Sequence, residues 1–187
     1  MNHRSARSES PPSLIRPHRL TSVTDASLGW FTTPPLWHID AVGGRPPHHY
    51  KTTTITAALR ATGLIARTVF DGATNGMRFR AYVTDTLAPV LKPGDTVILD
   101  NLNAHKVAGV REAIEAVGAQ VLYLPPYSPD FNPIEQVFAK AKALLRTAAA
   151  RTADDLTRAI HDAFAAFRPD ECRNYLTAAG YDAYDPI

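Results

Sequence analysis

The stretch DTVILDNLNAHKVAGVREAIEAVGAQVLYLPPYSPDFNPIEQVFAKAKALLR, residues 95–146, indicates the fold. Its first apolar run, residues 95–100, is typical of a buried parallel strand. Residues 105–118 space their apolar side chains for one helical face, and residues 120–126 predict a second buried strand. A proline-rich turn leads into a helix over 133–150, with Asn132 as its N-cap. Alternation of strand, helix and strand predicts a parallel sheet covered by helices.

The segments on either side extend this sheet. Residues 51–63 and 64–72 read as two strands joined by a turn, which predicts an antiparallel hairpin and makes the sheet mixed. Residues 77–91 predict a helix, and amphipathic helices are expected over 152–167 and 169–179. The apolar face of the first of these helices holds Phe79, Tyr82, Val83, Thr86 and Leu87.

The N-terminal part of the sequence is less regular. Residues 1–18 are rich in Arg, Ser, His and Pro, and we expect them to be disordered. Residues 19–50 contain two proline pairs and a Gly-Gly pair, which predict irregular structure with a degenerate first strand. The regular core, with its C-terminal helices, is expected over 51–187.

Composition sets broad limits. The 187 residues include 45% hydrophobic and 20% charged residues, a balance typical of one globular domain. A net charge of +2 permits nucleic-acid binding without requiring it. The single Cys172 cannot form an internal disulfide and indicates a small buried residue in a reducing compartment. No apolar run is long enough to span a membrane, so we expect a cytoplasmic protein with no membrane partner.

Two carboxylates stand at positions suited to chemistry. Asp100 closes a predicted buried strand, where catalytic groups gather in open α/β sheets, although Asp in this position also forms turns. Glu135 lies in the first turn of a predicted helix, where a capping box with Asn132 would also explain it. Together they could face one cleft, and carboxylates are the ligands that Mg²⁺ and Mn²⁺ prefer.

Two strings carry a family resemblance. ILDNLNAHK (98–106) and LYLPPYSPDFNPIEQVFAKAKALLR (122–146) resemble the second and third catalytic motifs of mariner-like DDE transposases. The similarity is to the insertion-sequence 630 branch and extends over residues 51–181. It implies an RNase H-like α/β fold, in which a mixed five-stranded sheet is flanked by helices.

The resemblance also implies roles for residues. Asp100 and Glu135 match the second and third metal-binding catalytic carboxylates. We interpret Tyr127 and its neighbours in the loop before Glu135 as shaping that loop. The residues predicted to contact nucleic acid are Asn101, His105, Lys106, Lys140 and Lys142. Each has a structural alternative: a turn or helix-start contact for the first two, and a solvated helix face for the lysines, with Arg146 and Arg151 beside them.

The sequence differs from the family pattern at the first catalytic carboxylate. The family pattern places it after an apolar strand, and no such string is present. Asp25, preceded mainly by Thr and Ser, is our candidate for this catalytic and metal-binding position. Asp40 has a more apolar lead but lies too close to the hairpin. That no residue fills the role is an equal alternative.

Function follows from the resemblance. It implies a DNA transposase catalytic domain in which two Mg²⁺ or Mn²⁺ ions support DNA cleavage and strand transfer. The implied partners are terminal-repeat and target DNA, a second copy of the chain, and a separately encoded helix-turn-helix half, because that region is missing here. A bacterial protein, nucleoid-associated when bound to DNA, would be expected. The alternatives are an inactive transposase remnant that binds DNA or a partner, and a host RNase H-type nuclease.

Overall fold

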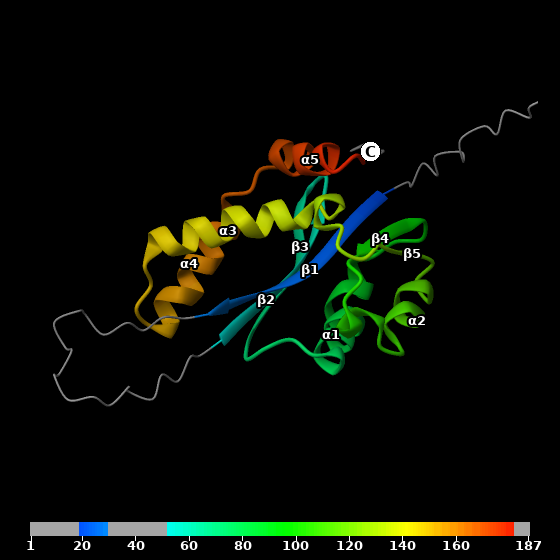
Figure 1. The fold of residues 1–187 in the computed structure, drawn as a ribbon, viewed down its shortest axis with the longest axis horizontal. Helices are drawn as coiled ribbons and strands as arrows, with labels where there is room; N and C mark the ends of the chain where they lie inside the picture. The colour runs from blue at the N-terminus through cyan, green and yellow to red at the C-terminus, as the bar shows by residue number, and fades with distance from the viewer. Residues whose placement is uncertain (1–18, 30–51, 182–187) are drawn as a thin grey trace, which may run out of the picture.

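The computed structural model describes residues 19–29 and 52–181, which form one sheet with helices on both faces (Figure 1). The sheet has five strands in the order β3-β2-β1-β4-β5. Their bounds are β1 Arg19–Gly29, β2 Thr52–Arg60, β3 Gly63–Asp71, β4 Asp95–Leu99 and β5 Gln120–Tyr123. The predictions for residues 1–18, for 30–50 and for Asp40 lie outside the described residues.

The sheet is mixed, as predicted. β2 pairs antiparallel with both β1 and β3, whereas β4 pairs parallel with β1 and β5. The expected hairpin is confirmed, with Arg60 opposite Gly63 at its turn. This arrangement confirms the predicted α/β fold.

The central strand corrects our interpretation of the N-terminal region. Residues 19–29 are not irregular but form β1, which lies between β2 and β4. Two of its hydroxyl side chains are buried and hydrogen-bonded: Thr21 Oγ1 accepts from Arg60 Nε at 3.0 Å, and Ser22 Oγ donates to Asn132 Oδ1 at 2.5 Å. A polar sequence can therefore occupy the middle of the sheet, because its polar atoms have partners.

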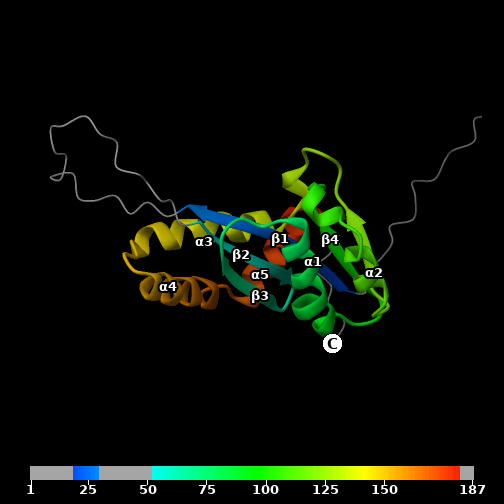
Figure 2. The same cartoon turned by 90° about the horizontal axis from the view of Figure 1, so that it is seen from below.

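Two layers of helices cover the sheet. One face packs against α3 (Ile134–Ala148), α4 (Ala153–Ala165) and α5 (Pro169–Ala178). The other packs against α1 (Gly76–Tyr82) and α2 (Val110–Glu115) (Figures 1 and 2). A π-helical turn, η2 (Val83–Leu87), and a 3-10 turn, η3 (Ala88–Val90), continue from α1. The predicted apolar face is confirmed for four residues, whereas the fifth, Thr86, is only partly buried.

Two predicted elements differ in extent or burial. The helix expected over 105–118 is shorter, because Gly109 adopts φ 93 at its N-cap and α2 begins only at Val110. A separate 3-10 turn, η4 (Asn103–Lys106), precedes it. β5 is not a buried strand but lies at the sheet edge, where Leu122 is 44% exposed. Among the described helices, none has the length and apolar character to cross a membrane.

Candidate active site at the ends of the central strands

Asp100 directly follows the last residue of β4. Its side chain is 25% exposed, so it is accessible without being fully solvated. Its Oδ1 accepts from the backbone N–H of Leu102 at 3.1 Å and lies 2.5 Å from Nδ1 of His105. The turn that the sequence predicted is therefore present, and the same carboxylate oxygen also contacts a histidine.

His105 is held by packing on the inner side of this turn. Its side chain is completely buried, and its ring stacks on Phe79 with centroids 3.9 Å apart. The Tyr123 hydroxyl donates to the backbone carbonyl of His105 at 3.1 Å. A buried imidazole cannot reach DNA, so our prediction that His105 contacts nucleic acid is wrong. Its position instead supports Asp100.

The strand register places Asp25 at the end of the sheet where Asp100 follows β4. Val23 opposite Leu99 is the last parallel pair between β1 and β4, and Asp25 lies two residues beyond it. Asp25 is itself paired with Thr56 of β2. This is the edge at which Asp100 leaves β4. The side chain of Asp25 lies outside the description, so its assignment as the first carboxylate stays a prediction.

Glu135 is partly buried in the first turn of α3. The segment before it is attached to the central strand, because Asn132 accepts the buried hydrogen bond from Ser22. The backbone N–H of Glu135 donates to the carbonyl of Asn132 at 3.0 Å. The predicted side-chain cap by Asn132 is wrong, since α3 has no side-chain capping bond and Asn132 binds the sheet instead. The sequence carried no signal for the pairing of two residues so far apart.

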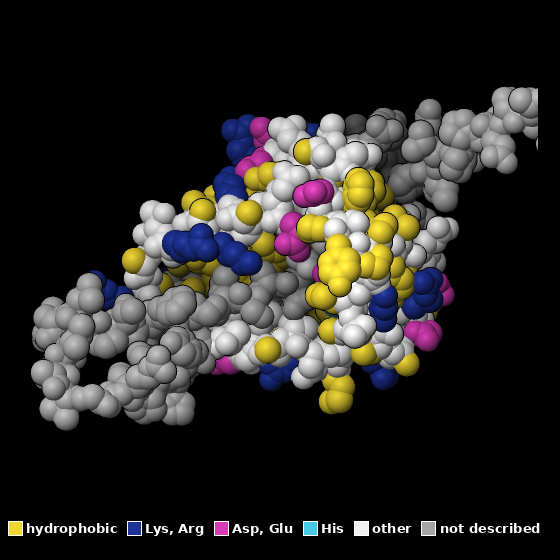
Figure 3. All heavy atoms as spheres, viewed as in Figure 1, with side chains coloured by type: hydrophobic (Ala, Val, Ile, Leu, Met, Phe, Trp, Pro, Cys, Tyr) yellow, Lys and Arg dark blue, Asp and Glu magenta, His cyan; other side chains and the backbone are white. Residues whose placement is uncertain are grey.

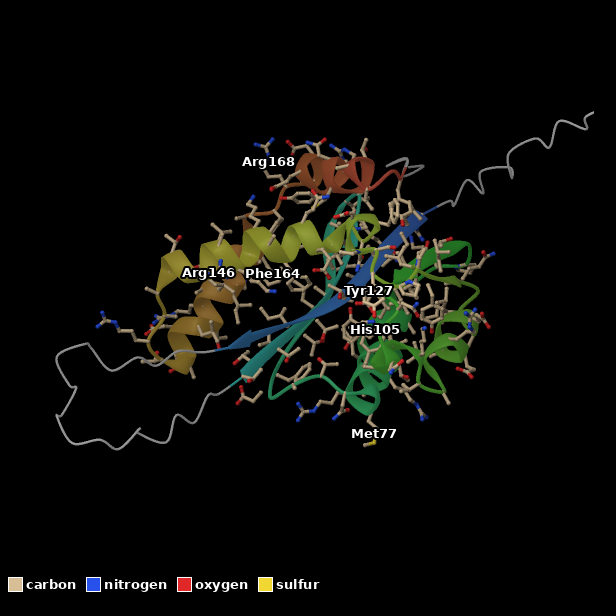
Figure 4. All side chains as sticks on the ribbon, in the orientation of Figure 1. Met77, His105, Tyr127, Arg146, Phe164 and Arg168 are labelled. Carbon is tan, nitrogen blue, oxygen red and sulfur yellow. The ribbon has the colours of Figure 1, made fainter. Side chains whose placement is uncertain are left out.

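The loop between β5 and α3 also begins beside Asp100. The N–H of Leu124 donates to the carbonyl of Leu99 at 2.8 Å, which continues the β4–β5 pairing to the end of β4. One end of this loop therefore lies beside Asp100 and the other leads into Glu135. In the view of Figure 4, Tyr127 of this loop and His105 lie over the same part of the ribbon.

The donor chemistry of the site fits a hard divalent cation only in part. Asp100 and Glu135 supply carboxylate oxygens, the ligand type that Mg²⁺ and Mn²⁺ take. Within residues 19–24 and 52–181, where side chains are described, no three His, Cys, Asp or Glu side chains group closely enough to hold a metal ion. A complete site would therefore need a ligand such as Asp25.

Lys140, one of the residues predicted to contact DNA, forms an ion pair within the protein. Lys140 Nζ donates to both carboxylate oxygens of Glu171 at 2.7 and 2.8 Å, and lies 4.7 Å from the ring centroid of Phe167. The Lys140 hydrogen bond, with one from Tyr175, lowers the pKa of Glu171. The ammonium of Lys140 thus joins α3 to α5, and its assignment to DNA stays a prediction.

Other basic residues remain accessible. Lys106 is exposed, with its Nζ 5.9 Å from the ring centroid of Tyr123, and Lys142 is partly exposed on α3. Arg146 is exposed one turn further along the helix. Asn101 is partly buried beside Asp100. Figure 3 shows two groups of Lys and Arg side chains on this face, one over α3 and one over α2, with acidic side chains between them.

Comparisons with known proteins agree with this arrangement. A solved structure of the Mos1 transposase catalytic domain with raltegravir and Mg superposes with a TM-score of 0.67 at 19% identity, covering 87% of this chain and 78% of that chain. The catalytic domain of Mos1 mariner transposase gives 0.60 at 18% identity, covering 87% and 77%. A pre-cleavage Mos1 transpososome gives 0.64 at 17% identity, covering 88% of this chain. These likenesses confirm the RNase H-like fold.

The matches cover different shares of the compared proteins. The chain covers only 53% of the transposase chain in the transpososome. No protein among the curated ones matches the sequence. The model of one family, described as DDE superfamily endonuclease, matches residues 40–157. Since that match spans more than half of this chain, the chain belongs to the DDE superfamily of endonucleases.

Proposed function

We propose that this chain is the catalytic domain of a DNA transposase, which cuts and joins DNA strands with the help of divalent metal ions. The observation that carries the proposal is the strand register, which brings Asp25 to the end of the sheet where Asp100 follows β4. Asp100 directly follows β4, Asp25 lies two residues past the last β1–β4 pair, and the segment before Glu135 is bonded to β1.

The metal ligands would be Asp25, Asp100 and Glu135. Bound Mg²⁺ or Mn²⁺ would supply positive charge to stabilise the attacking and leaving oxygens of a phosphodiester. The protein's own contribution is positioning. The His105 ring, fixed by Phe79, holds one oxygen of Asp100, and the rigid start of α3 presents Glu135. Carboxylates on rigid elements suit this task, because catalysis of phosphoryl transfer depends mainly on geometry and electrostatics.

The proposed substrate is DNA that bears the ends of a transposable element, together with target DNA. Lys106, Lys142 and Arg146 are accessible cations that could contact phosphates on either side of the carboxylates. The related structures include Mos1 paired-end complexes with a transposon end, which favours a dimer acting on two ends. We further propose membership of the insertion-sequence 630 branch, from the two motifs, and that a helix-turn-helix region, in the same or another chain, recognises the element ends. A bacterial nucleoid would be the place of action.

An inactive remnant was the alternative, and the structure disfavours one argument for it. A missing first strand would have removed the position of the first carboxylate, yet β1 lies in the centre of the sheet. The register of Asp25, two residues beyond the last β1–β4 pair, supports our proposal that it is the first carboxylate.

The test is nicking of supercoiled plasmid and of duplex carrying the element ends, in Mn²⁺ or Mg²⁺, with any upstream helix-turn-helix product added. We expect Asp25→Asn, Asp100→Asn and Glu135→Gln each to reduce cleavage to background. Asp162→Asn, at a side chain on α4 that is 82% exposed, is the matched control and should cleave normally. Cleavage that survives all three site substitutions, or no cleavage by the unmodified chain with its partner, would contradict the proposal.

A further inference from the structure

Tyr127 is the most exposed large hydrophobic residue among those described. Its relative exposure is 102%, so the ring has no packing partner in the fold. It lies in the loop between β5 and α3. Most tyrosines bury much of their ring, because its apolar area is large. A ring left wholly in water at the edge of a candidate active site suggests contact with something outside the chain.

The backbone of Tyr127 is also strained. Its φ is 59, in the left-handed region that residues with a Cβ disfavour. Within the described residues, the other non-glycine positions with positive φ are Ala66 and Ala149, which have small side chains. Strain of this kind persists when the surrounding structure enforces it, and it concentrates at functional sites.

The loop around Tyr127 is well supported. Ser128 Oγ donates to the carbonyl of Pro126 at 3.3 Å, and the N–H of Asn132 donates to the carbonyl of Pro129 at 2.9 Å. The Tyr181 hydroxyl donates to the carbonyl of Phe131 at 2.9 Å, which joins the loop to the end of α5. These bonds support the loop backbone from which the Tyr127 side chain projects.

The chemistry around the ring restricts what it could contact. Leu102 and Phe131, each 53% exposed, add apolar surface near the ends of the same loop and of the Asp100 turn. The carboxylates Asp100 and Glu135 would repel phosphate groups that approach closely unless cations intervene. The uncharged face of a nucleobase has no such penalty and stacks well on an aromatic ring.

We propose that Tyr127 stacks on an unpaired base of the DNA strand bound at the candidate active site; this rests on the proposed function. A paired base in a duplex has both faces covered by its neighbours, so the ring would meet a base that has left the stack. The accessible cations Lys142 and Lys106 would hold the flanking backbone. Stacking would fix the position of the strand relative to the carboxylates.

The experiment measures base stacking separately from cleavage. Duplexes carrying one unpaired 2-aminopurine, and single strands carrying the same base, are titrated with protein in EDTA. We expect the unmodified chain and Tyr127→Phe to change the fluorescence equally. Tyr127→Ala and Tyr127→Gly should lose the change and bind the unpaired DNA about 5- to 100-fold more weakly. Tyr127→Gly relieves the strained φ, so its Tm should not fall, and loss of stacking cannot then come from unfolding.

Met77→Ala, at a side chain on α1 that is 82% exposed, is the control for removing an exposed apolar group. Stacking is refuted if Tyr127→Ala and Tyr127→Gly retain the fluorescence change and the affinity, or if they alter self-association instead. Asp100→Asn and Glu135→Gln separate the two proposals, because they should abolish cleavage but keep the fluorescence change. A Tyr127-dependent change in a chain that does not cleave would overturn the transposase function and leave stacking intact.

Discussion

Replacement of His105 by phenylalanine should loosen Asp100 while the core stays filled. The phenyl ring can keep the stacking on Phe79, whose centroid lies 3.9 Å from that of His105. It cannot replace the Nδ1 atom that lies 2.5 Å from Asp100 Oδ1. The substitution therefore isolates one polar contact at the candidate active site.

The size of the effect follows from the surroundings of this contact. A hydrogen bond to a charged group contributes about 1.5–3 kcal/mol. We take this range as the upper bound for the contact between His105 Nδ1 and Asp100 Oδ1, because the distance is short but the direction is not that of a regular hydrogen bond. Asp100 is 25% exposed, so water can replace part of the interaction and we expect a loss near the lower end, about 1.5 kcal/mol. Loss of residues that orient a metal ligand typically lowers metal affinity or activity by about 10- to 100-fold. A tenfold loss of metal affinity corresponds to about 1.4 kcal/mol of binding free energy.

Two measurements test this expectation. Urea unfolding should show a loss of about 1–2 kcal/mol for His105→Phe, and a larger loss for His105→Ala, which also removes the stacking and leaves a cavity. Nicking rates over a Mn²⁺ titration should require about tenfold more metal for His105→Phe. The matched control is His161→Phe, because the His161 side chain is 76% exposed on α4.

The reasoning would be refuted by a His105→Phe variant whose Mn²⁺ dependence and stability both match those of the unmodified chain. Equal losses in His105→Phe and His105→Ala would also contradict it in part, because stacking on Phe79 would then contribute nothing. A loss of stability without a change in metal dependence would make His105 a packing residue and no more.

Three further predictions concern the parts that support the site. Asp95 is 1% exposed and accepts from two arginines at 2.7 and 2.8 Å, so Asp95→Ala should lower the unfolding free energy by about 3–5 kcal/mol in urea. Ser22→Ala removes the buried donor to Asn132 and should cost about 1–3 kcal/mol by the same method, whereas an unchanged midpoint would show that this bond does not hold α3. The Glu171 pKa is lowered mainly by Lys140, so their pair stabilises the fold above the ordinary pKa of glutamate, about 4.3, and that stability is lost as the pH falls through the lower folded-state value. Lys140→Met should remove this acid-dependent loss, about 1 kcal/mol or less, in Tm measured between neutral and acidic pH.

The segments that could be predicted have strong local patterns. The hairpin of β2 and β3 follows from β-branched residues on both sides of a glycine turn. The apolar run of β4 and the amphipathic patterns of α3, α4 and α5 can be recognised from neighbouring residues in the sequence alone. Asp100 and Glu135 could be singled out because both lie at the ends of such elements.

The parts that could not be predicted depend on partners distant in sequence. β1 looks irregular because it contains Thr and Ser where a central strand usually has Val and Ile. The hydroxyls of Thr21 and Ser22 can be buried because Arg60 and Asn132 bond to them. The pairing of Lys140 with Glu171, thirty-one positions away, is likewise visible only in the structure.

By itself, the sequence determined the order of most elements and the mixed sheet, and it pointed to Asp100 and Glu135 as the candidate carboxylates. These depend on local periodicity and on short motifs, which a single chain displays directly. The tertiary structure alone decided that β1 is the central strand, that Asp25 reaches the edge beside Asp100, and that His105 is buried behind that carboxylate. The physical reason is that register, burial and pairing of polar groups are set by contacts between residues far apart in the chain.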